Sequence, residues 1–497
     1  MQAFGTALSL VFTWQVMITI LLSSVFGLLV GAIPGLTATM ATALLVPFAF
    51  MLDPVSAIAA IVSATAMAIF AGDIPGCLLR LPGTPASAAY TEEAYAMTKG
   101  GQAGYVLGTN LLFSALGGLF GTVILVTSAP LLAEYALSIS HTEYFWLSCL
   151  GLTCAIFVAT DQPLKGAASL LLGLFIATIG RDYTTGFVRF TFGESELIGG
   201  VSFVPALIGL FAIPEILRTL LAPEGSEERI EVGRLRIFAG FFATLRRYWS
   251  NFLRSSVIGT AVGALPGAGA DIAAWTSYAV SKKMTREPEK WGRGHIEGIV
   301  DATSANNAAL SGAWIPALVF AIPGDSITAI AIGVMYLKNV NPGPTIFLQN
   351  AHILYAVFIV FFVANLLMIP LGWLAIRAST PILRIRRKLL MPVLLLFCVL
   401  GAYAIDNNIF GVVIMLVLGL IGYVMEESGF PVSPAVLGIV MGQLVEQNLM
   451  TSLIKTGGNL IGFFDRPLSA VFAAATLLIW GLSIGGMVRR RLAGARP

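Results

Sequence analysis

Two stretches of the chain share one pattern: GAIPGLTATMATA at residues 31–43 and GALPGAGADIAAW at residues 263–275, which begin 232 positions apart. In each stretch a Gly-x-x-Pro-Gly sequence interrupts an apolar, helix-forming run. Proline removes a backbone donor and disrupts the preceding helical turn, whereas glycine permits unusual backbone angles and close approach. The repeated interruption therefore predicts two broken helices at equivalent places in the fold.

The composition places these breaks in a membrane. Of the 497 residues, 57% are hydrophobic and only 11% are charged, which is too little charge to cover the surface of a soluble protein. Apolar runs begin near residues 7, 55, 104, 131, 164, 198, 351, 389, 408 and 467. Because a spanning helix needs about 20 residues, we predict an all-α polytopic membrane protein with about 10–12 transmembrane helices. The first run, Ala7 to Val30, lacks a basic n-region and is expected to remain as the first span.

The basic residues predict the orientation of the chain. Of the 29 Lys and Arg residues, 20 lie in residues 223–254, 281–297, 377–388 and 489–497, and the positive-inside rule assigns all four stretches to the cytoplasm. The segment 255–280 lies between two of them, so we expect it to enter and return as a re-entrant hairpin with Pro266 and Gly267 near its tip. The alternative is that one basic stretch is translocated.

The first copy of the pattern has the opposite flanks. Residues 1–22 and 49–65 contain no Lys or Arg, and the first basic residue of the chain is Arg80. A second pair of breaks, Leu81-Pro82-Gly83-Thr84 and Ile322-Pro323-Gly324-Asp325, lies 241 positions apart. Two inverted repeats with broken helices that converge near the midplane are a recurring plan of secondary transporters. We therefore expect a first repeat half at 1–222, a basic amphipathic connector at 223–254, a second repeat core at 255–376 and C-terminal membrane helices at 377–497.

The breaks predict a solute site. Non-helical backbone survives at membrane depth only where it is buried in protein or lines a wet cavity; freed carbonyls there can hold a cation, and the N–H groups that start the next half-helix favour anions. Close helix packing by small residues is the alternative explanation. The predicted helix breaks are Pro34, Pro82, Pro266 and Pro323, and the candidate substrate-binding residues are Gly35, Thr37, Arg80, Gly83, Thr84, Ser87, Gly267, Asn306, Asn307, Gly324 and Ser326.

Several of these side chains carry open alternatives. Asp271 and Asp325 fall in the predicted membrane interior, where ionisable residues are functional candidates, or they cap half-helices. A carboxylate would repel an anion, so Thr39, Asp271, Asn306 and Asp325 are the cation-binding candidates. The adjacent amides of Asn306 and Asn307 can donate to a carboxylate and accept from a cation, or they join two helices. Arg80 either neutralises an anionic ligand or snorkels to the surface.

Other functions have less support in the sequence. The three histidines lie in separate segments without metal-ligand spacing, the four cysteines form no zinc pattern, and no catalytic motif is found. We therefore expect no enzyme, no nucleic-acid partner and no cofactor beyond a coupling Na+ or H+. An intramembrane enzyme and a passive anion channel are the rival classes. The basic and aromatic segment 223–254 is either an amphipathic helix on membrane lipid or an ordinary cytoplasmic loop.

Four motifs resemble the large membrane subunit of tripartite tricarboxylate transporters, the TctA family: GAIPGLTATMATALLVPFAF (31–50), RLPGTPASAAY (80–90), GALPGAGADIAAWTSYAVSKK (263–283) and SANNAALSGAWIPALVFAIPG (304–324). The resemblance implies a bacterial inner-membrane, multi-pass subunit that takes organic anions from a periplasmic solute-binding protein. It also implies a small, TctB-like membrane subunit and a sodium or proton gradient. Matched by motif, the four Pro-Gly pairs, Thr84 and Asn306-Asn307 would line the site.

The chain departs from the family pattern close to that site. It has Glu92-Glu93-Ala94-Tyr95-Ala96 where the family usually has an Asp-Gly-Tyr-Pro run, and Thr303-Ser304 where it usually has Pro-Glu. Arg80 stands where a neutral polar residue is common, and Asp325 where Ser is usual. These changes disfavour citrate and favour a different carboxylate as the substrate.

Overall fold

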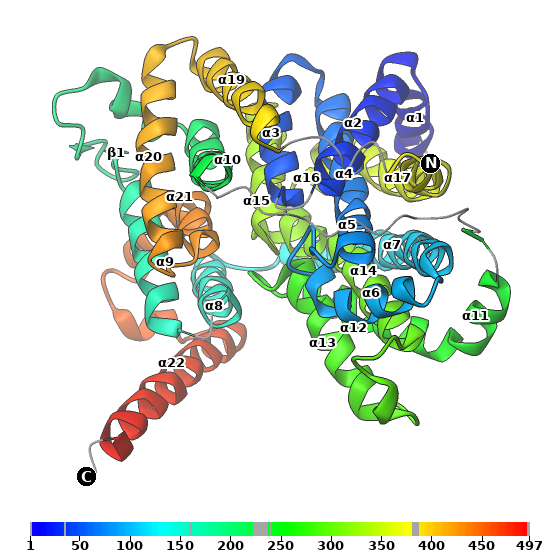
Figure 1. The fold of residues 1–497 in the computed structure, drawn as a ribbon. Coiled ribbons are helices and arrows are strands. Elements are labelled where there is room, and N and C mark those ends of the chain that lie inside the picture. The colour runs from blue at the N-terminus through cyan, green and yellow to red at the C-terminus, as the bar shows by residue number, and fades with distance from the viewer. Residues whose placement is uncertain are drawn as a thin grey trace. The chain divides into compact units, whose positions relative to one another are not determined.

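The computed structural model describes residues 2–33, 36–159, 162–221, 237–238, 240–379 and 387–494. This part of the chain is helical apart from one antiparallel pair of short strands, β1 (Gly180–Arg181) and β2 (Val188–Arg189) (Figure 1). Within it, six helical segments are long and apolar enough to cross a membrane: Trp14–Ala32, Pro54–Leu79, Ala103–Ala136, Phe203–Leu221, Ala351–Arg377 and Ile409–Glu427. Five shorter apolar helices accompany them. The predicted all-α polytopic membrane fold is confirmed, whereas the number of crossings stays a prediction.

The chain divides into two compact units, residues 1–134 with 202–428 and residues 135–201 with 429–497. The helices of the first unit are α1 (Gln2–Val11), α2 (Trp14–Ala32), α3 (Ala38–Met51), α4 (Pro54–Ala71), α5 (Asp73–Leu79), η1 (Ser87–Ala89), α6 (Thr91–Lys99), most of α7 (Ala103–Ala136), α10 (Phe203–Leu221), α11 (Phe241–Arg247), α12 (Trp249–Gly263), α13 (Gly269–Met284), η3 (Pro288–Lys290), α14 (Ile296–Phe320), α15 (Ser326–Leu337), α16 (Ile346–Gln349), α17 (Ala351–Arg377), α19 (Arg387–Asp406) and α20 (Ile409–Glu427). Those of the second unit are α8 (His141–Ala159), α9 (Pro163–Ala177), η2 (Ser195–Gly199), α21 (Val432–Lys455), η4 (Leu460–Phe463) and α22 (Pro467–Gly494). These units do not test the predicted boundaries of the repeat halves, which stay a prediction.

The predicted first span is two helices in the structure. The apolar run from Ala7 to Val30 is interrupted because α1 ends at Val11 and α2 begins at Trp14. Thr13 has extended backbone and its side-chain oxygen accepts a hydrogen bond from the Val16 N–H, so it is the N-cap of α2. Thr13 therefore marks this break, which contains no Pro-Gly pair.

The first unit contains a helical arrangement that occurs twice. α2 and α3 pack against each other and against α4, and α12 and α13 pack against each other and against α14. A Cβ on Gly27 would overlap the Ala64 backbone of α4, and a Cβ on Gly259 would overlap the Ala305 backbone of α14. Gly27 and Gly259 lie 232 residues apart, and Ala64 and Ala305 lie 241 residues apart. These are the two offsets of the sequence motifs. The re-entrant hairpin predicted at 255–280 thus corresponds to the paired helices α12 and α13.

Two sets of hydrogen bonds join the copies at their ends. Lys338, at the end of α15, donates from Nζ to the Phe50 carbonyl at the open end of the α2–α3 pair, 2.6 Å away. At the other end, Glu93 of α6 accepts hydrogen bonds from the N–H groups of Gly294 and His295, just before α14. The last helix of each copy thus contacts the other copy beside the start of its third helix, and the inversion of the two repeats stays a prediction.

The basic connector is only partly described. Residues 223–236 and 239 of the predicted segment lie outside the described residues. In the described part, Phe241 packs on a cluster of Phe113, Phe252 and Val300, whereas Phe242 is 83% exposed. One aromatic therefore anchors α11 to the protein and the next faces outward. The choice between a lipid-binding helix and an ordinary loop stays open.

Candidate functional site

The second break of each repeat has one geometry. Arg80 ends α5 and Ala321 ends α14, both in the left-handed region with φ near 58° and 56°. The next residue in each case, Leu81 or Ile322, donates its N–H back to a proline carbonyl six residues earlier, at 3.4 and 3.3 Å. A left-handed residue that ends a helix in this way reverses the chain out of it. The Pro-Gly pairs that follow, Pro82-Gly83 and Pro323-Gly324, are therefore true breaks, as predicted.

Glycine is required where these breaks pack. A Cβ on Gly83 would lie 2.6 Å from the Gly72 Cα and 3.0 Å from the Gly31 carbonyl oxygen. A Cβ on Gly324 would likewise lie 2.8 Å from the Gly263 carbonyl oxygen. Gly83 and Gly324 thus let the second break of each repeat pack directly against the residues where the first break of the same repeat begins. Pro34 and Gly35 themselves lie outside the described residues.

Three of the predicted breaks meet one another. The Gly267 N–H, at φ 81°, donates to the Gly324 carbonyl at 2.8 Å. The Ala86 N–H, just after the Pro82 break, donates to Oδ1 of Asp271 at 3.0 Å. Trp275 of α13 adds a bond from its indole to the Pro85 carbonyl at 3.2 Å. The structure therefore brings the breaks near Pro82, Pro266 and Pro323 into one place.

The residues just after the second break of each repeat form the same pair of hydrogen bonds, although only the pair at α15 caps a helix. Thr84 and Ser87 exchange backbone-to-side-chain hydrogen bonds at 3.1 and 3.2 Å. Asp325 and Thr328 do the same at 2.9 and 2.7 Å, which is a capping box at the start of α15. Asp325 therefore occupies the N-cap position, one of its two predicted roles. The Thr84 and Ser87 groups are engaged in the same way.

The predicted amide pair lies buried without partners. Asn306 and Asn307 of α14 are each 1% exposed, and no oxygen or nitrogen of either amide forms a hydrogen bond within the described part of the chain. The Tyr90 phenol lies beside Asn306 and is close enough to interact with its amide, whereas Asn307 has no such neighbour among the described residues. Buried polar groups normally find partners, so a buried amide pair with this much unused hydrogen-bonding capacity is a place where a ligand or water would bind. These amides are the strongest candidate ligand-binding groups in the first unit.

The remaining predicted residues lie less centrally. Arg80 is 58% exposed and forms a two-pronged bond to the Glu92 carboxylate, at 2.9 and 3.0 Å. Thr37 is the N-cap of α3 and accepts from the Met40 N–H at 3.2 Å. Thr39 in α3 and Ser326 in α15 are partly buried. None of these four is joined to the amide pair by a hydrogen bond that the structure shows.

Sequence reasoning missed Asp73 and Tyr90. Asp73 is 2% and Tyr90 1% exposed, and the tyrosine hydroxyl donates to Oδ1 of the aspartate. The other oxygen of Asp73 is buried without a partner. Thr303 and Asn306 lie beside the Tyr90 phenol. The signal was available, because Asp73 is an acidic residue inside an apolar run.

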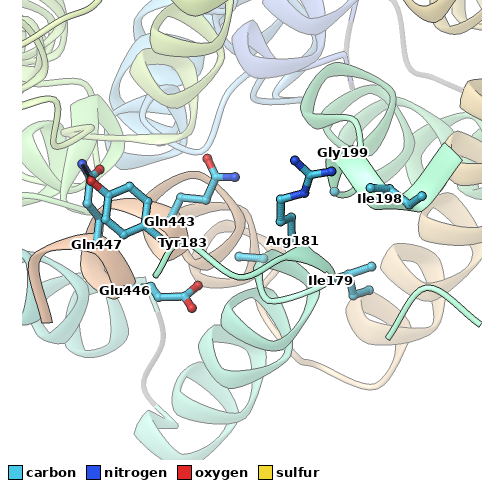
Figure 2. Close-up of a pocket in the computed structure, with 10 residues that line it drawn as sticks. Ile179, Arg181, Tyr183, Ile198, Gly199, Gln443, Glu446 and Gln447 are labelled. Carbon is cyan, nitrogen blue, oxygen red and sulfur yellow. Dashed lines mark hydrogen bonds between the residues drawn. The ribbon is translucent and has the colours of Figure 1, made fainter. Parts of the chain in front are cut away.

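The second unit contains a cavity of its own, of about 530 Å³ (Figure 2). Tyr183 accepts a hydrogen bond from Gln447 at its wall, at 2.9 Å. Arg189 joins Glu446 of α21 to Asp182 at 2.8 and 3.3 Å. The hydrogen bond to Glu446 raises the pKa of Arg189, and hydrogen bonds from Thr185 and Thr184 lower the pKa of Asp182. No residue predicted for the solute site lines this cavity.

Metal binding has no cluster to support it in the described residues. Among them there is no group of three or more His, Cys, Asp or Glu side chains placed to hold a metal ion. The four cysteines are free thiols, and Cys77 and Cys398 are buried.

Comparison with known proteins gives one family. Residues 17–437 match the model of the tripartite tricarboxylate transporter TctA family. An Agrobacterium vitis protein named "uncharacterized 52.8 kDa protein in TAR-I ttuC' 3'region" is 33% identical over 453 residues, which is 91% of this chain and 89% of that protein. A second, "uncharacterized protein in TAR-II ttuC' 3'region", is 33% identical over 212 residues, 43% of this chain and 88% of that protein. No solved structure matches the chain.

Proposed function

The chain belongs to the tripartite tricarboxylate transporter TctA family, and we propose that it is the large permease subunit of a binding-protein-dependent secondary transporter. In this proposal the subunit imports organic carboxylate anions and is coupled to a sodium or proton gradient. The observation that carries the proposal is the unpartnered pair Asn306-Asn307, buried in the repeat whose breaks meet those of the other repeat.

The chemistry of these groups suits a carboxylate. An amide nitrogen donates to a carboxylate oxygen, and an amide oxygen accepts from a cation or a protonated group. Backbone N–H groups at the start of a helix add a partial positive charge. We assign the anion to the two amides, because N–H groups that follow the breaks already donate to Ser87, Asp271 and Asp325. If the ion is sodium, Thr39, Asp271, Asn306 and Asp325 are its candidate ligands, although both carboxylates already accept backbone hydrogen bonds.

The partners and the location follow from the family. We propose that the subunit lies in a bacterial inner membrane, where a periplasmic solute-binding protein delivers the anion and a small membrane subunit completes the complex. Arg80 is outside this proposal as an anion ligand, because Glu92 already neutralises it. The departures of the chain near the site favour a carboxylate other than citrate.

Uptake into proteoliposomes tests the proposal. The chain is reconstituted with its small subunit and its binding protein and offered labelled citrate, malate, succinate and tartrate, with a sodium gradient, a pH gradient or neither. Gradient-dependent accumulation of one anion is expected. Passage without accumulation or counterflow would indicate a channel, and chemical conversion of the anion an enzyme. No movement of any anion, with all partners folded, would overturn the proposal.

Leucine at the close-packed glycines tests the site itself. Gly83→Leu and Gly267→Leu are expected to reduce uptake to background, because the first position has no room for a Cβ and the second has a left-handed backbone. Gly5→Leu is the matched control, since a Cβ at Gly5 meets no atom within 4 Å. Membrane insertion is measured by extraction and gel filtration. Normal uptake by both site variants would contradict the location.

A further inference from the structure

Asp73 occupies an unusual place for an acid. It is the first residue of α5 and is 2% exposed, and it follows directly on α4, in which every residue from Val55 to Ala71 is buried. α2 and α4, which pack against α5, contain no Asp, Glu, Lys, Arg or His. The η1 helix, which also contacts α5, contains none either. These three elements that contact α5 therefore bring no charged side chain to it.

α6 also contacts α5 and carries three charged side chains, each of which has an interaction of its own. α6 contributes Glu92, bonded to Arg80, and Glu93, which accepts backbone hydrogen bonds at the start of α14. Lys99 at the end of α6 lies over the Tyr95 ring, 4.9 Å from its centre. The Cys77 thiol, in α5 itself, is the other ionisable group beside Asp73. Asp73 has no ion pair within the described part of the chain.

Only one oxygen of Asp73 is satisfied. Oδ1 accepts from the Tyr90 hydroxyl, and Oδ2 is buried without a hydrogen-bond partner. An ionised carboxylate that is buried without a cation is costly, whereas a neutral carboxyl group is tolerated. Oδ2 is the atom that remains to carry a proton.

This carboxyl group adjoins the candidate solute site. Gly72, the residue before it, accepts the Gly83 N–H at 3.1 Å and so belongs to the break at Pro82. Tyr90, its hydrogen-bond donor, lies beside Asn306 and Thr303 of α14. One phenol therefore separates the acid from the unpartnered amides. A solute bound at Asn306 and Asn307 would be two side chains away from Asp73.

The fold does not require an acid here. The equivalent position of the second repeat, 241 residues later, is Trp314, which is 1% exposed and buried in α14. The same helical arrangement thus accommodates a large apolar ring at one copy and a carboxyl group at the other. The packing of the repeat therefore does not require an acid at this position, which favours a functional role for Asp73.

We propose that Asp73 is the proton-binding group that couples solute movement to a proton gradient. The proposal rests on the transport function argued above and narrows the coupling ion to H+. A proton from water on one side binds Oδ2 while the solute is held at the amide pair, and it leaves to water on the other side after the site has changed its access. Tyr90 orients the carboxyl group through Oδ1.

The test separates coupled uptake from exchange. Proteoliposomes containing the full chain, the small subunit and the binding protein enclose a pH-sensitive dye and receive the labelled carboxylate that wild type accumulates from the panel above. Asp73→Asn is expected to lose accumulation driven by a pH gradient by roughly tenfold or more, because the coupling carboxyl is absent. It is expected to retain exchange of labelled for unlabelled solute, and solute entry should carry no proton. Asp53→Asn, the same charge change at a helix N-cap where Asn also caps, should behave as wild type.

Each other outcome has a definite meaning. Proton-driven accumulation by Asp73→Asn at the wild-type level would overturn the proposal, and so would wild-type uptake that follows sodium alone without proton entry; the transport function would survive both. Failure of wild type to move any anion would instead overturn the transport function. If Asp73→Asn does not fold, Tyr90→Phe replaces it. That variant should change the pH at which uptake is half-maximal, and an unchanged pH profile would also overturn the proposal.

Discussion

At the scale of single residues, two adjacent glutamates have opposite environments. Glu93 is fully buried and accepts from the N–H groups of Gly294 and His295, both at 2.7 Å, and from the Tyr278 hydroxyl at 3.1 Å. Glu92 is 58% exposed and pairs only with Arg80. Buried charge-assisted bonds to backbone N–H groups stabilise strongly, whereas exposed ion pairs contribute little.

The two glutamates therefore make a matched test of stability. Glu93→Gln replaces an acceptor oxygen by an NH2 group that faces N–H donors, and we expect a loss of about 1–3 kcal/mol in the free energy of unfolding. Glu92→Gln should change it by about 0.5 kcal/mol or less. Thermal unfolding of both variants in detergent measures the difference. Equal losses would mean that Glu93 does not hold α6 to the start of α14.

The sequence indicated these residues only in part. It marks Glu92, Glu93 and Arg80 as departures from the family pattern, but it does not tell which acid is buried. The direction of a side chain at a break depends on the backbone, and the left-handed conformation of Arg80 turns its side chain outward to Glu92. Asn306 and Asn307 could be predicted as candidates, yet their lack of partners emerges only from the packed structure.

At the scale of helices, the capping box on α15 separates two roles for Asp325. Asparagine caps helices as well as aspartate does, whereas alanine does not. We expect Asp325→Ala to lose about 1 kcal/mol of stability and Asp325→Asn to remain close to wild type. If the residue only caps α15, Asp325→Asn also keeps full uptake. Uptake by Asp325→Asn that requires more sodium than wild type would show that the carboxylate binds the cation instead.

The helix breaks were predicted where Pro-Gly pairs occur and missed where they do not. Proline alone does not break the helices of this chain, since Pro130 lies inside α7 and Pro370 inside α17. The Pro-Gly pairs at 82–83 and 323–324 do follow helix ends, where the glycine accepts a close backbone contact, whereas Pro75-Gly76 lies inside α5. The break at Thr13 depends on a side-chain cap, which a hydropathy pattern does not reveal.

At the scale of the whole chain, the repeat was predicted from two pairs of motifs and recurs in the packing, whereas its inversion was predicted from the flanking charges and stays a prediction. The end of α15 meets the Phe50 carbonyl, and α6 meets the entry of α14. The offsets of 232 and 241 recur in packing glycines, in the paired hydrogen bonds after the second breaks and in left-handed helix ends. The second unit, by contrast, carries no motif that the sequence singled out, so its cavity was not predicted.

The inverted repeats predict that the two helix pairs open to opposite sides of the membrane. Met51, at the end of α3, is 80% exposed and lies in the stretch without basic residues. Glu289 is exposed in the basic loop between α13 and α14. In a background without the four native cysteines, a membrane-impermeant maleimide added to intact cells should label Met51→Cys. Glu289→Cys should react only after permeabilisation, because the positive-inside rule keeps its loop in the cytoplasm. Labelling of both positions from the same side would contradict the inverted topology, and with it the placement of the site where the two repeats meet.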